Sequence, residues 1–156
     1  MSLLEIQTIF SSTDQPSDAQ LQHWVETVLR DTHPDGEVLI RIVDEQESST
    51  LNEQYRHKQG PTNILSFPFE APAIPDFHSD MLGDLVICSP VLAQEAHTQN
   101  KPITAHWAHI VIHGVLHLLG YDHLEDDDAK LMEQKEITLL ATLNFENPYQ
   151  DEYASK

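Results

Sequence analysis

This sequence is poor in cysteine and in basic residues. Cys88 is the only cysteine among 156 residues, so an internal disulfide is excluded and a buried thiol is expected. Lysine and arginine number 8 against 26 aspartates and glutamates, which gives a formal net charge of −18. This balance argues against a protein that binds nucleic acid by neutralising many phosphates, and against one that binds an anionic membrane surface.

Long apolar runs are also missing. No stretch approaches the roughly 20 apolar residues that a membrane-spanning helix requires. Residues 1–15, MSLLEIQTIFSSTDQ, contain neither a basic region nor a long apolar run of the kind found in a signal peptide. We therefore expect a cytoplasmic protein without a membrane partner. A chain of this length buries a core without disulfides, so residues 1–156 are expected to form a single domain; no pattern indicates an oligomeric state.

Segments typical of strands and of helices alternate along the chain. Alternating and β-branched apolar residues predict strands at residues 3–10, 37–45, 62–70 and 81–89. Apolar residues at helical spacing predict helices at 18–32, 45–58, 91–99, 102–119 and 124–145. Pro68 predicts an edge position for the third strand, because proline cannot donate to a strand ladder. The expected fold class is α/β (α+β), a small mixed β-sheet packed with helices.

The last of these helices begins with an acidic run, Glu125 to Asp128, which favours a helix N-terminus and a solvated face. Its apolar side is expected to consist of Leu131, Ile137, Leu140 and Leu143.

Five of the ten histidines lie within residues 106–123, HWAHIVIHGVLHLLGYDH. A helix turns about 100° per residue, so the first four histidines of this segment share one side of the predicted helix. Gly120 is expected to end the helix, since glycine adopts the left-handed conformation without a Cβ penalty. The turn after it can bring His123 back toward the same side.

A metal site follows from this spacing. His113 and His117 are four residues apart, which places their Cβ atoms about 5–6 Å from each other, and His123 supplies a third imidazole. Three protein ligands with one open position are typical of catalytic zinc. We predict one Zn²⁺ per chain on His113, His117 and His123, with another imidazole-binding divalent metal as the alternative. His106 and His109 would contact substrate or support the ligands.

The spacing also resembles the metal-site helix of metzincin proteases, H-E-x-x-H-x-x-G-x-x-H. Gly114 stands where those enzymes carry the glutamate that acts as general base. A metzincin-like metalloprotease therefore remains an alternative, weakened at this position. The roles of Asp84 and Asp122 stay open between structure and function.

Three segments together resemble a known family. HGVLHLLGYDH, YRHKQGPTNILSFPFE and LGDLVIC are similar to segments of the YbeY family of bacterial ribosomal-RNA maturation endoribonucleases, in the same order over about residues 50–125. The resemblance implies a zinc-dependent hydrolase that cleaves single-stranded RNA. It also implies a role in maturing the 3′ end of small-subunit ribosomal RNA and in ribosome quality control, with the ribosome or ribosomal proteins as partners.

The resemblance further implies that Arg56 and His113 take part in catalysis. A guanidinium group suits this chemistry, because it pairs with the charged oxygens of a phosphodiester. The alternative for Arg56 is a surface ion pair with Glu53 or another nearby acid. A final alternative for the whole protein is a non-enzymatic ribosome-assembly factor whose metal only stabilises the fold.

Overall fold

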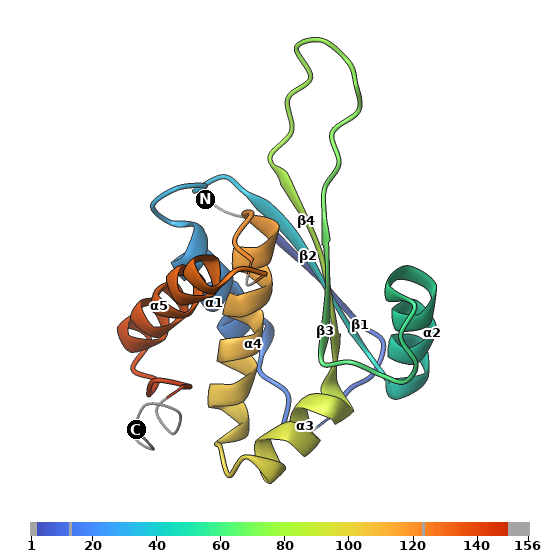
Figure 1. The fold of residues 1–156 in the computed structure, drawn as a ribbon, viewed down its shortest axis with the longest axis vertical. Coiled ribbons are helices and arrows are strands. Elements are labelled where there is room, and N and C mark those ends of the chain that lie inside the picture. Colours follow the sequence, from blue (N-terminus) through green and yellow to red (C-terminus); the bar gives the residue numbers. More distant parts are fainter. Residues whose placement is uncertain (1–2, 13, 123, 150–156) are drawn as a thin grey trace.

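The computed structural model describes residues 3–12, 14–122 and 124–149, and nine helices and strands are assigned within them. In chain order they are β1 (Leu3–Thr8), α1 (Asp18–Leu29), β2 (Glu37–Val43), α2 (Glu45–Arg56), β3 (Ile64–Pro68), β4 (Met81–Cys88), α3 (Ser89–Thr98), α4 (Ile103–Leu118) and α5 (Asp126–Thr142). Each predicted element is present, and most are shorter than predicted by a few residues at one or both ends. Figure 1 shows their arrangement.

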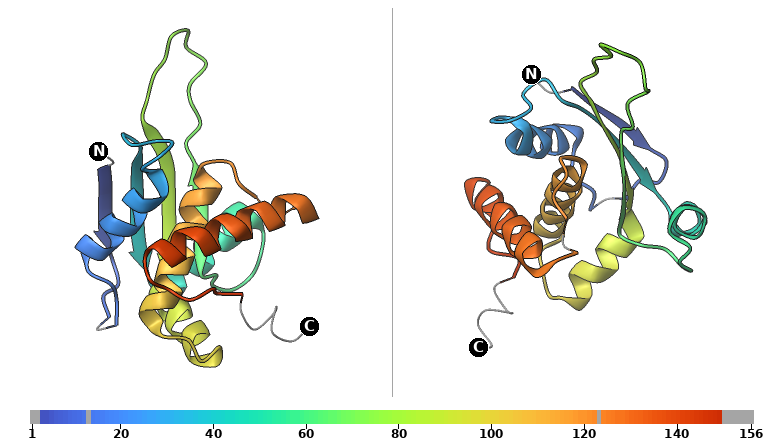
Figure 2. Two further views of the ribbon diagram at one scale, coloured as in Figure 1. Left: turned by 90° about the vertical axis from the view of Figure 1, so that its left-hand side faces the viewer. Right: turned by 45° about the horizontal axis from the view of Figure 1, so that its top comes forward.

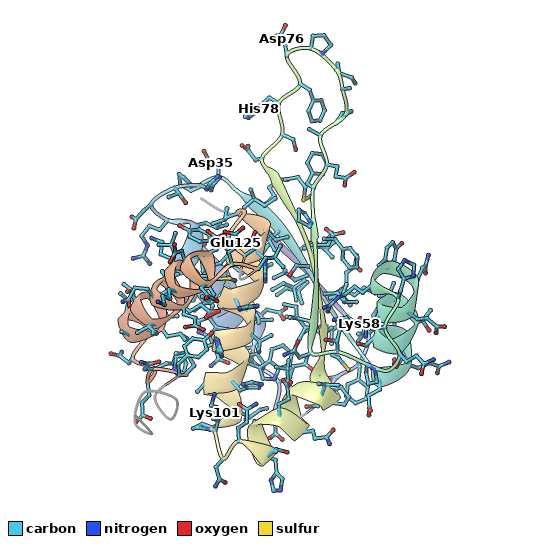
Figure 3. The ribbon with its side chains drawn as sticks, viewed as in Figure 1. Asp35, Lys58, Asp76, His78, Lys101 and Glu125 are labelled. Carbon is cyan, nitrogen blue, oxygen red and sulfur yellow. The ribbon has the colours of Figure 1, made fainter. Side chains whose placement is uncertain are left out.

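The four strands form one mixed sheet in the order β1-β2-β4-β3. β1, β2 and β4 are parallel, whereas β3 runs antiparallel to β4. The predicted fold class and the predicted edge position of the strand that contains Pro68 are both confirmed. The connection between β3 and β4 projects beyond the sheet as a long loop, with Asp76 and His78 near its tip (Figure 3).

Helices cover the two faces of the sheet unequally. One face packs against α1 and α4, and α5 lies on the outer side of α4 (Figures 1 and 2). The other face carries α2, which contributes Leu51 to a smaller cluster with Val43, Leu65 and Val86. Cys88 is buried in that cluster as a free thiol, as predicted.

The larger core surrounds α4. Trp107, Ala108, Val111, Ile112 and Val115 of this helix are at most 1% exposed. They meet the inward side chains of the sheet and one side of α1, namely Val38, Ile40, Ile42, Leu85, Ile87, Leu21, Trp24 and Val25. This burial fixes the helix that carries the histidines against the sheet.

The apolar side predicted for α5 is partly wrong. Leu131 is 59% exposed, whereas its neighbour Met132 is 2% exposed and Leu140 is 1% exposed. The buried side therefore follows the spacing 132, 136 and 140. This spacing places Glu136, which is 0% exposed, between two core residues.

Candidate metal centre

α4 presents His113 and His117 one turn apart. Pro102 precedes the helix, and at its far end Gly120 has a φ of 101°, as predicted for the terminating glycine. The amides of Gly120 and Tyr121 close this end by donating to the carbonyls of His117 and Leu116, at 3.0 and 3.1 Å. The His113 and His117 rings lie 4.7 Å apart between centroids and nearly perpendicular, at 83°. Two imidazoles so placed can face one ion.

The third predicted ligand, His123, lies outside the described residues. Within the ranges that the structure describes, no three His, Cys, Asp or Glu side chains are grouped so as to hold a metal ion. The structure therefore brings together two members of the predicted set, and the three-histidine site remains a prediction.

Gly114 lies where α4 comes close to the sheet. A Cβ atom added there would lie 2.6 Å from Cδ1 of Ile64 and 2.9 Å from Cδ2 of Leu85. The position after His113 thus faces β3 and β4, on the side of the helix turned to the sheet. A glutamate, as in metzincins, would have to enter an apolar interface, so packing accounts for the glycine here.

A carboxylate nevertheless reaches His113, and it comes from α5. Glu136 Oε1 accepts a hydrogen bond from Nδ1 of His113 at 2.6 Å, and Oε2 accepts one from the hydroxyl of Tyr149. Nε2 of His109 lies 3.5 Å from the same Oε2. Burial raises the pKa of Glu136, but hydrogen bonds from His109, His113 and Tyr149 outweigh it and lower the pKa to about 2. Glu136 is therefore ionised at neutral pH.

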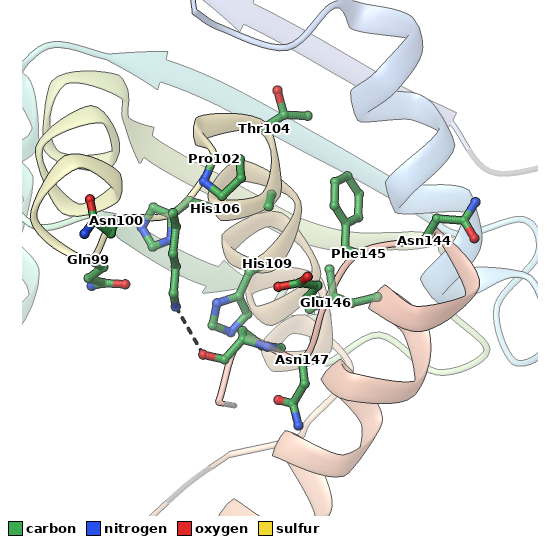
Figure 4. A pocket seen from close by; sticks show the side chains of 14 residues that line it. Gln99, Asn100, Pro102, Thr104, His106, His109, Asn144, Phe145, Glu146 and Asn147 are labelled. Carbon is green, nitrogen blue, oxygen red and sulfur yellow. Dashed lines mark hydrogen bonds between the residues drawn. The ribbon is translucent and has the colours of Figure 1, made fainter. Parts of the chain in front are cut away.

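His106 and His109 continue the stripe away from His113, and both contact other parts of the chain. Nε2 of His106 lies 2.9 Å from Oε1 of Glu95, and Nε2 of His109 lies 3.2 Å from the hydroxyl of Tyr149. Nδ1 of each ring is buried without a hydrogen-bond partner among the described residues. Both side chains also line a cavity of about 450 Å³ between the start of α4 and the segment that follows α5 (Figure 4).

The structure separates Arg56 from the histidines. Arg56 is exposed in the last turn of α2, on the opposite face of the sheet from α4 (Figure 2). Lys58 lies just beyond it (Figure 3). Among the ion pairs of the described residues, none joins Arg56 to Glu53, so that alternative is not observed.

The two aspartates with open roles differ in setting. Asp122 Oδ1 accepts from the amide of Leu124 at 3.2 Å, which favours the role of a turn cap. Asp84 lies on the α2 face of β4, in one cross-strand row with Leu39 and Glu5. Partial burial raises the pKa of Asp84, and the charge of Glu5 adds to the effect.

Sequence reasoning missed Glu136 and Tyr149. The acidic run at the start of α5 predicted a solvated face for that helix. Glu136 was assigned neither to that face nor to the apolar side. A signal was present, because Glu136 stands four residues from both Met132 and Leu140. Tyr149 gave no comparable signal, since it belongs to the polar segment after the last helix.

The residues present fit a divalent metal. His113 donates through Nδ1 to a carboxylate, which leaves the lone pair of the ring on Nε2. Glu136 is a buried anion that accepts hydrogen bonds from His113 and Tyr149 and has the His109 ring nearby; within the described ranges no lysine or arginine pairs with it. A cation on the far side of His113 would balance this charge.

Comparison with known proteins identifies the family. The family described as Endoribonuclease YbeY matches residues 7–144, a range that contains Arg56 and all three predicted ligands. The chain is 49% identical over 154 residues to the Endoribonuclease YbeY of Coxiella burnetii strain Dugway 5J108-111, covering 97% of this chain and 100% of the relative. The same values hold for strain RSA 331 / Henzerling II. The chain belongs to the Endoribonuclease YbeY family.

The fold agrees with this membership. The solution structure of TM1509 from Thermotoga maritima superposes with a TM-score of 0.61 at 26% identity, covering 88% of this chain and 87% of that one. The resemblance inferred from three sequence segments is thereby confirmed, and so is the prediction of a hydrolytic endoribonuclease.

Membership in the YbeY family also decides between the alternatives. The metalloprotease and the non-enzymatic assembly factor find no support, because the family is one of endoribonucleases. Gly114 agrees, since a glutamate at this position would enter the apolar interface between α4 and the sheet. None of the helices assigned in the described ranges is long and apolar enough to cross a membrane.

Proposed function

We propose that this YbeY-family chain cleaves single-stranded RNA with the help of one zinc ion held by His113, His117 and His123. The observation that carries the proposal is the adjacent, nearly perpendicular pair of imidazoles on α4, one of them hydrogen-bonded to a buried carboxylate. Neutral imidazole is a preferred zinc ligand, and a ligating histidine usually donates its second ring nitrogen to such a carboxylate. Another imidazole-binding divalent metal is the alternative.

The chemistry divides between the metal and the side chains. A bound zinc ion with an open coordination position would supply a nucleophile at neutral pH, because such an ion lowers the pKa of water to about 7. His113 and His117 hold their rings in fixed orientations, because α4 is packed on the sheet and Glu136 fixes one ring. Glu136 reaches His113 from the α5 side and is 0% exposed, so we assign it no direct contact with RNA.

Arg56 is proposed as the second catalytic residue. Phosphodiester hydrolysis builds negative charge on the non-bridging oxygens, which a planar guanidinium can bind through two hydrogen bonds. Arg56 and His113 come from opposite faces of the sheet, and the edge strand β3 lies between the helices that carry them. An RNA strand that meets both residues would have to run along or around this edge.

The biological role follows the family resemblance. We propose that the substrate is ribosomal RNA, and that the enzyme matures the 3′ end of small-subunit RNA and acts in ribosome quality control in the cytoplasm. A ribosome or ribosomal-protein partner is supported by the charge of −18, which disfavours tight binding to free RNA. We also propose that residues 1–156 form one metallohydrolase domain.

The test combines metal removal with histidine substitution. Chelator-treated protein and His113→Ala are expected to lose cleavage of an internally labelled single-stranded RNA, and zinc should restore the treated wild type alone. His78→Ala is the matched control, since His78 lies on the projecting loop (Figure 3). Thermal unfolding of every sample separates lost chemistry from lost structure. Undiminished cleavage after metal removal, or by His113→Ala, would refute the proposal.

A further inference from the structure

Glu136 is a carboxylate in a place where carboxylates are costly. It is 0% exposed and shares one face of α5 with Met132 and Leu140, which belong to the apolar core. An ionised group in such surroundings is destabilising unless strong partners compensate it. Apolar residues of similar volume often replace buried charged groups without loss of stability, so the presence of Glu136 calls for a role beyond packing.

The contacts of Glu136 lead toward the histidine pair. One oxygen accepts from Nδ1 of His113 at 2.6 Å. The other accepts from the hydroxyl of Tyr149 and lies 3.5 Å from Nε2 of His109. The carboxylate is thus held from both sides, by α4 and by the segment after α5, and it has little freedom to turn away from His113.

This geometry determines which nitrogen of His113 is available to a metal. A carboxylate only accepts hydrogen bonds, so Nδ1 carries the proton and Nε2 carries the lone pair. The His117 ring lies on the next turn of the same helix, 4.7 Å from the His113 ring. We infer that Glu136 is a positioning residue for the metal, which fixes the ring orientation and tautomer of His113 and is itself held in place by Tyr149.

The inference rests on the proposed zinc site and goes beyond it. The negative charge of Glu136 makes the His113 imidazole a stronger electron donor, and the charge of a bound metal would offset the burial of the carboxylate. Glu136 and the metal would then stabilise each other through the ring of His113. A role in packing alone would need neither the charge of Glu136 nor its orientation by Tyr149.

Glu136→Gln separates the two explanations. Glutamine has nearly the same size, and its amide oxygen can still accept from Nδ1 of His113, so packing is retained while the charge is removed. Tyr149→Phe keeps the charge and removes the hydroxyl that holds the second oxygen. Glu133→Gln is the matched control on the same helix, because Glu133 is partly exposed whereas Glu136 is fully buried.

The measurement is the zinc dissociation constant of the full-length protein, obtained by competition with a chromophoric chelator, together with the melting temperature of the metal-free forms. Loss of a group that supports a metal ligand typically weakens binding about 10- to 100-fold. We expect a loss in this range for Glu136→Gln, a smaller loss for Tyr149→Phe and none for Glu133→Gln.

Each outcome decides the inference. Zinc affinity of Glu136→Gln within twofold of wild type would overturn it, while leaving the zinc site itself intact. If Glu136→Gln does not fold, Tyr149→Phe decides: weaker binding at unchanged metal-free stability supports the inference, and unchanged binding overturns it. Absence of zinc binding by the wild type would instead contradict the proposed function, and the inference would fall with it.

Discussion

At the scale of single residues, Gly114 shows how one position can be interpreted in two ways. From the sequence, its missing carboxylate argued against peptide hydrolysis. In the structure, Gly114 also lets α4 approach Ile64 and Leu85, so the same residue serves packing. The carboxylate that reaches His113 comes instead from Glu136, 23 residues further along the chain.

Substitutions at Gly114 test this explanation. Gly114→Ala should stay within about 1 kcal/mol of wild type, because a gain in helix propensity of about 1 kcal/mol offsets the displacement of two flexible side-chain ends. Gly114→Glu should lose several kcal/mol, because it drives a charge into an apolar interface. Urea denaturation of the metal-free proteins measures both. Wild-type stability of Gly114→Glu would contradict the close approach of α4 to the sheet. Peptidase activity of this variant would contradict the conclusion that a glutamate cannot take the protease role here.

Arg56 is expected to increase the rate of RNA cleavage. Arg56→Ala should lower kcat/KM on single-stranded RNA about 100-fold, the typical effect of removing one donor to a developing oxyanion. Arg56→Lys should recover only part of the rate, since an ammonium group cannot form the paired hydrogen bonds. Zinc content should not change, because α2 and α4 lie on opposite faces of the sheet.

Arg30→Ala serves as the control for Arg56, since Arg30 is an exposed arginine at the end of α1. Equal losses in the two variants would mean that general charge, and not the position of Arg56, matters. A rate for Arg56→Ala within a few-fold of wild type would remove Arg56 from the mechanism.

At the scale of elements, β3 and β4 depend on a close backbone contact at Gly83. This residue has a φ of 147°, and an added Cβ would lie 2.3 Å from the carbonyl oxygen of Phe67. Gly83→Ala should therefore cost about 3 kcal/mol or more, since backbone strain and overlap with a backbone atom add. Gly60→Ala should cost only about 1 kcal/mol, because Gly60 has a φ of 85° but nothing within 4 Å.

Equilibrium unfolding of the two glycine variants, compared with wild type, provides the measurement. Equal losses at Gly83 and Gly60 would indicate that φ alone matters and that the approach of Phe67 to Gly83 is looser than described.

The elements themselves could be predicted because local patterns specify them. Pro68 identified the edge strand, and Gly120 identified the end of α4. The side of α5 that is buried could not be chosen with the same ease, since leucines occur around that helix and only packing on α4 selects Met132 over Leu131. Because the buried side of α5 was not identified, the burial of Glu136 was not predicted. Its hydrogen-bond partners lie 23 and 13 residues away in the sequence.

The candidate site was likewise predictable only where local sequence patterns specify it. His113 and His117 belong to one helix, so their spacing fixes their proximity, and the structure places the rings side by side. Arg56 was proposed through family resemblance, and no local pattern indicates on which face of the sheet it lies. Tyr149 reaches the centre only through tertiary structure.

At the scale of the whole molecule, charge limits how the protein meets RNA. With a net charge of −18, the isolated protein is expected to bind single-stranded RNA weakly. If Arg56 and Lys58 make the two phosphate contacts, the logarithm of the association constant should fall with the logarithm of the salt concentration with a slope of about −1.4. Fluorescence anisotropy with a non-cleavable 2′-O-methyl oligonucleotide measures the slope. Tight binding at physiological salt with a much steeper slope would contradict a need for a partner.

The central claim is that a zinc ion held by His113, His117 and His123 enables RNA cleavage. Its most direct test is to titrate zinc into metal-free wild-type protein while following the initial rate of single-stranded RNA cleavage. We predict a rate that starts near zero, rises with added zinc and levels off at one zinc per chain. Full cleavage without added metal, or a rate that zinc does not change, would contradict the claim.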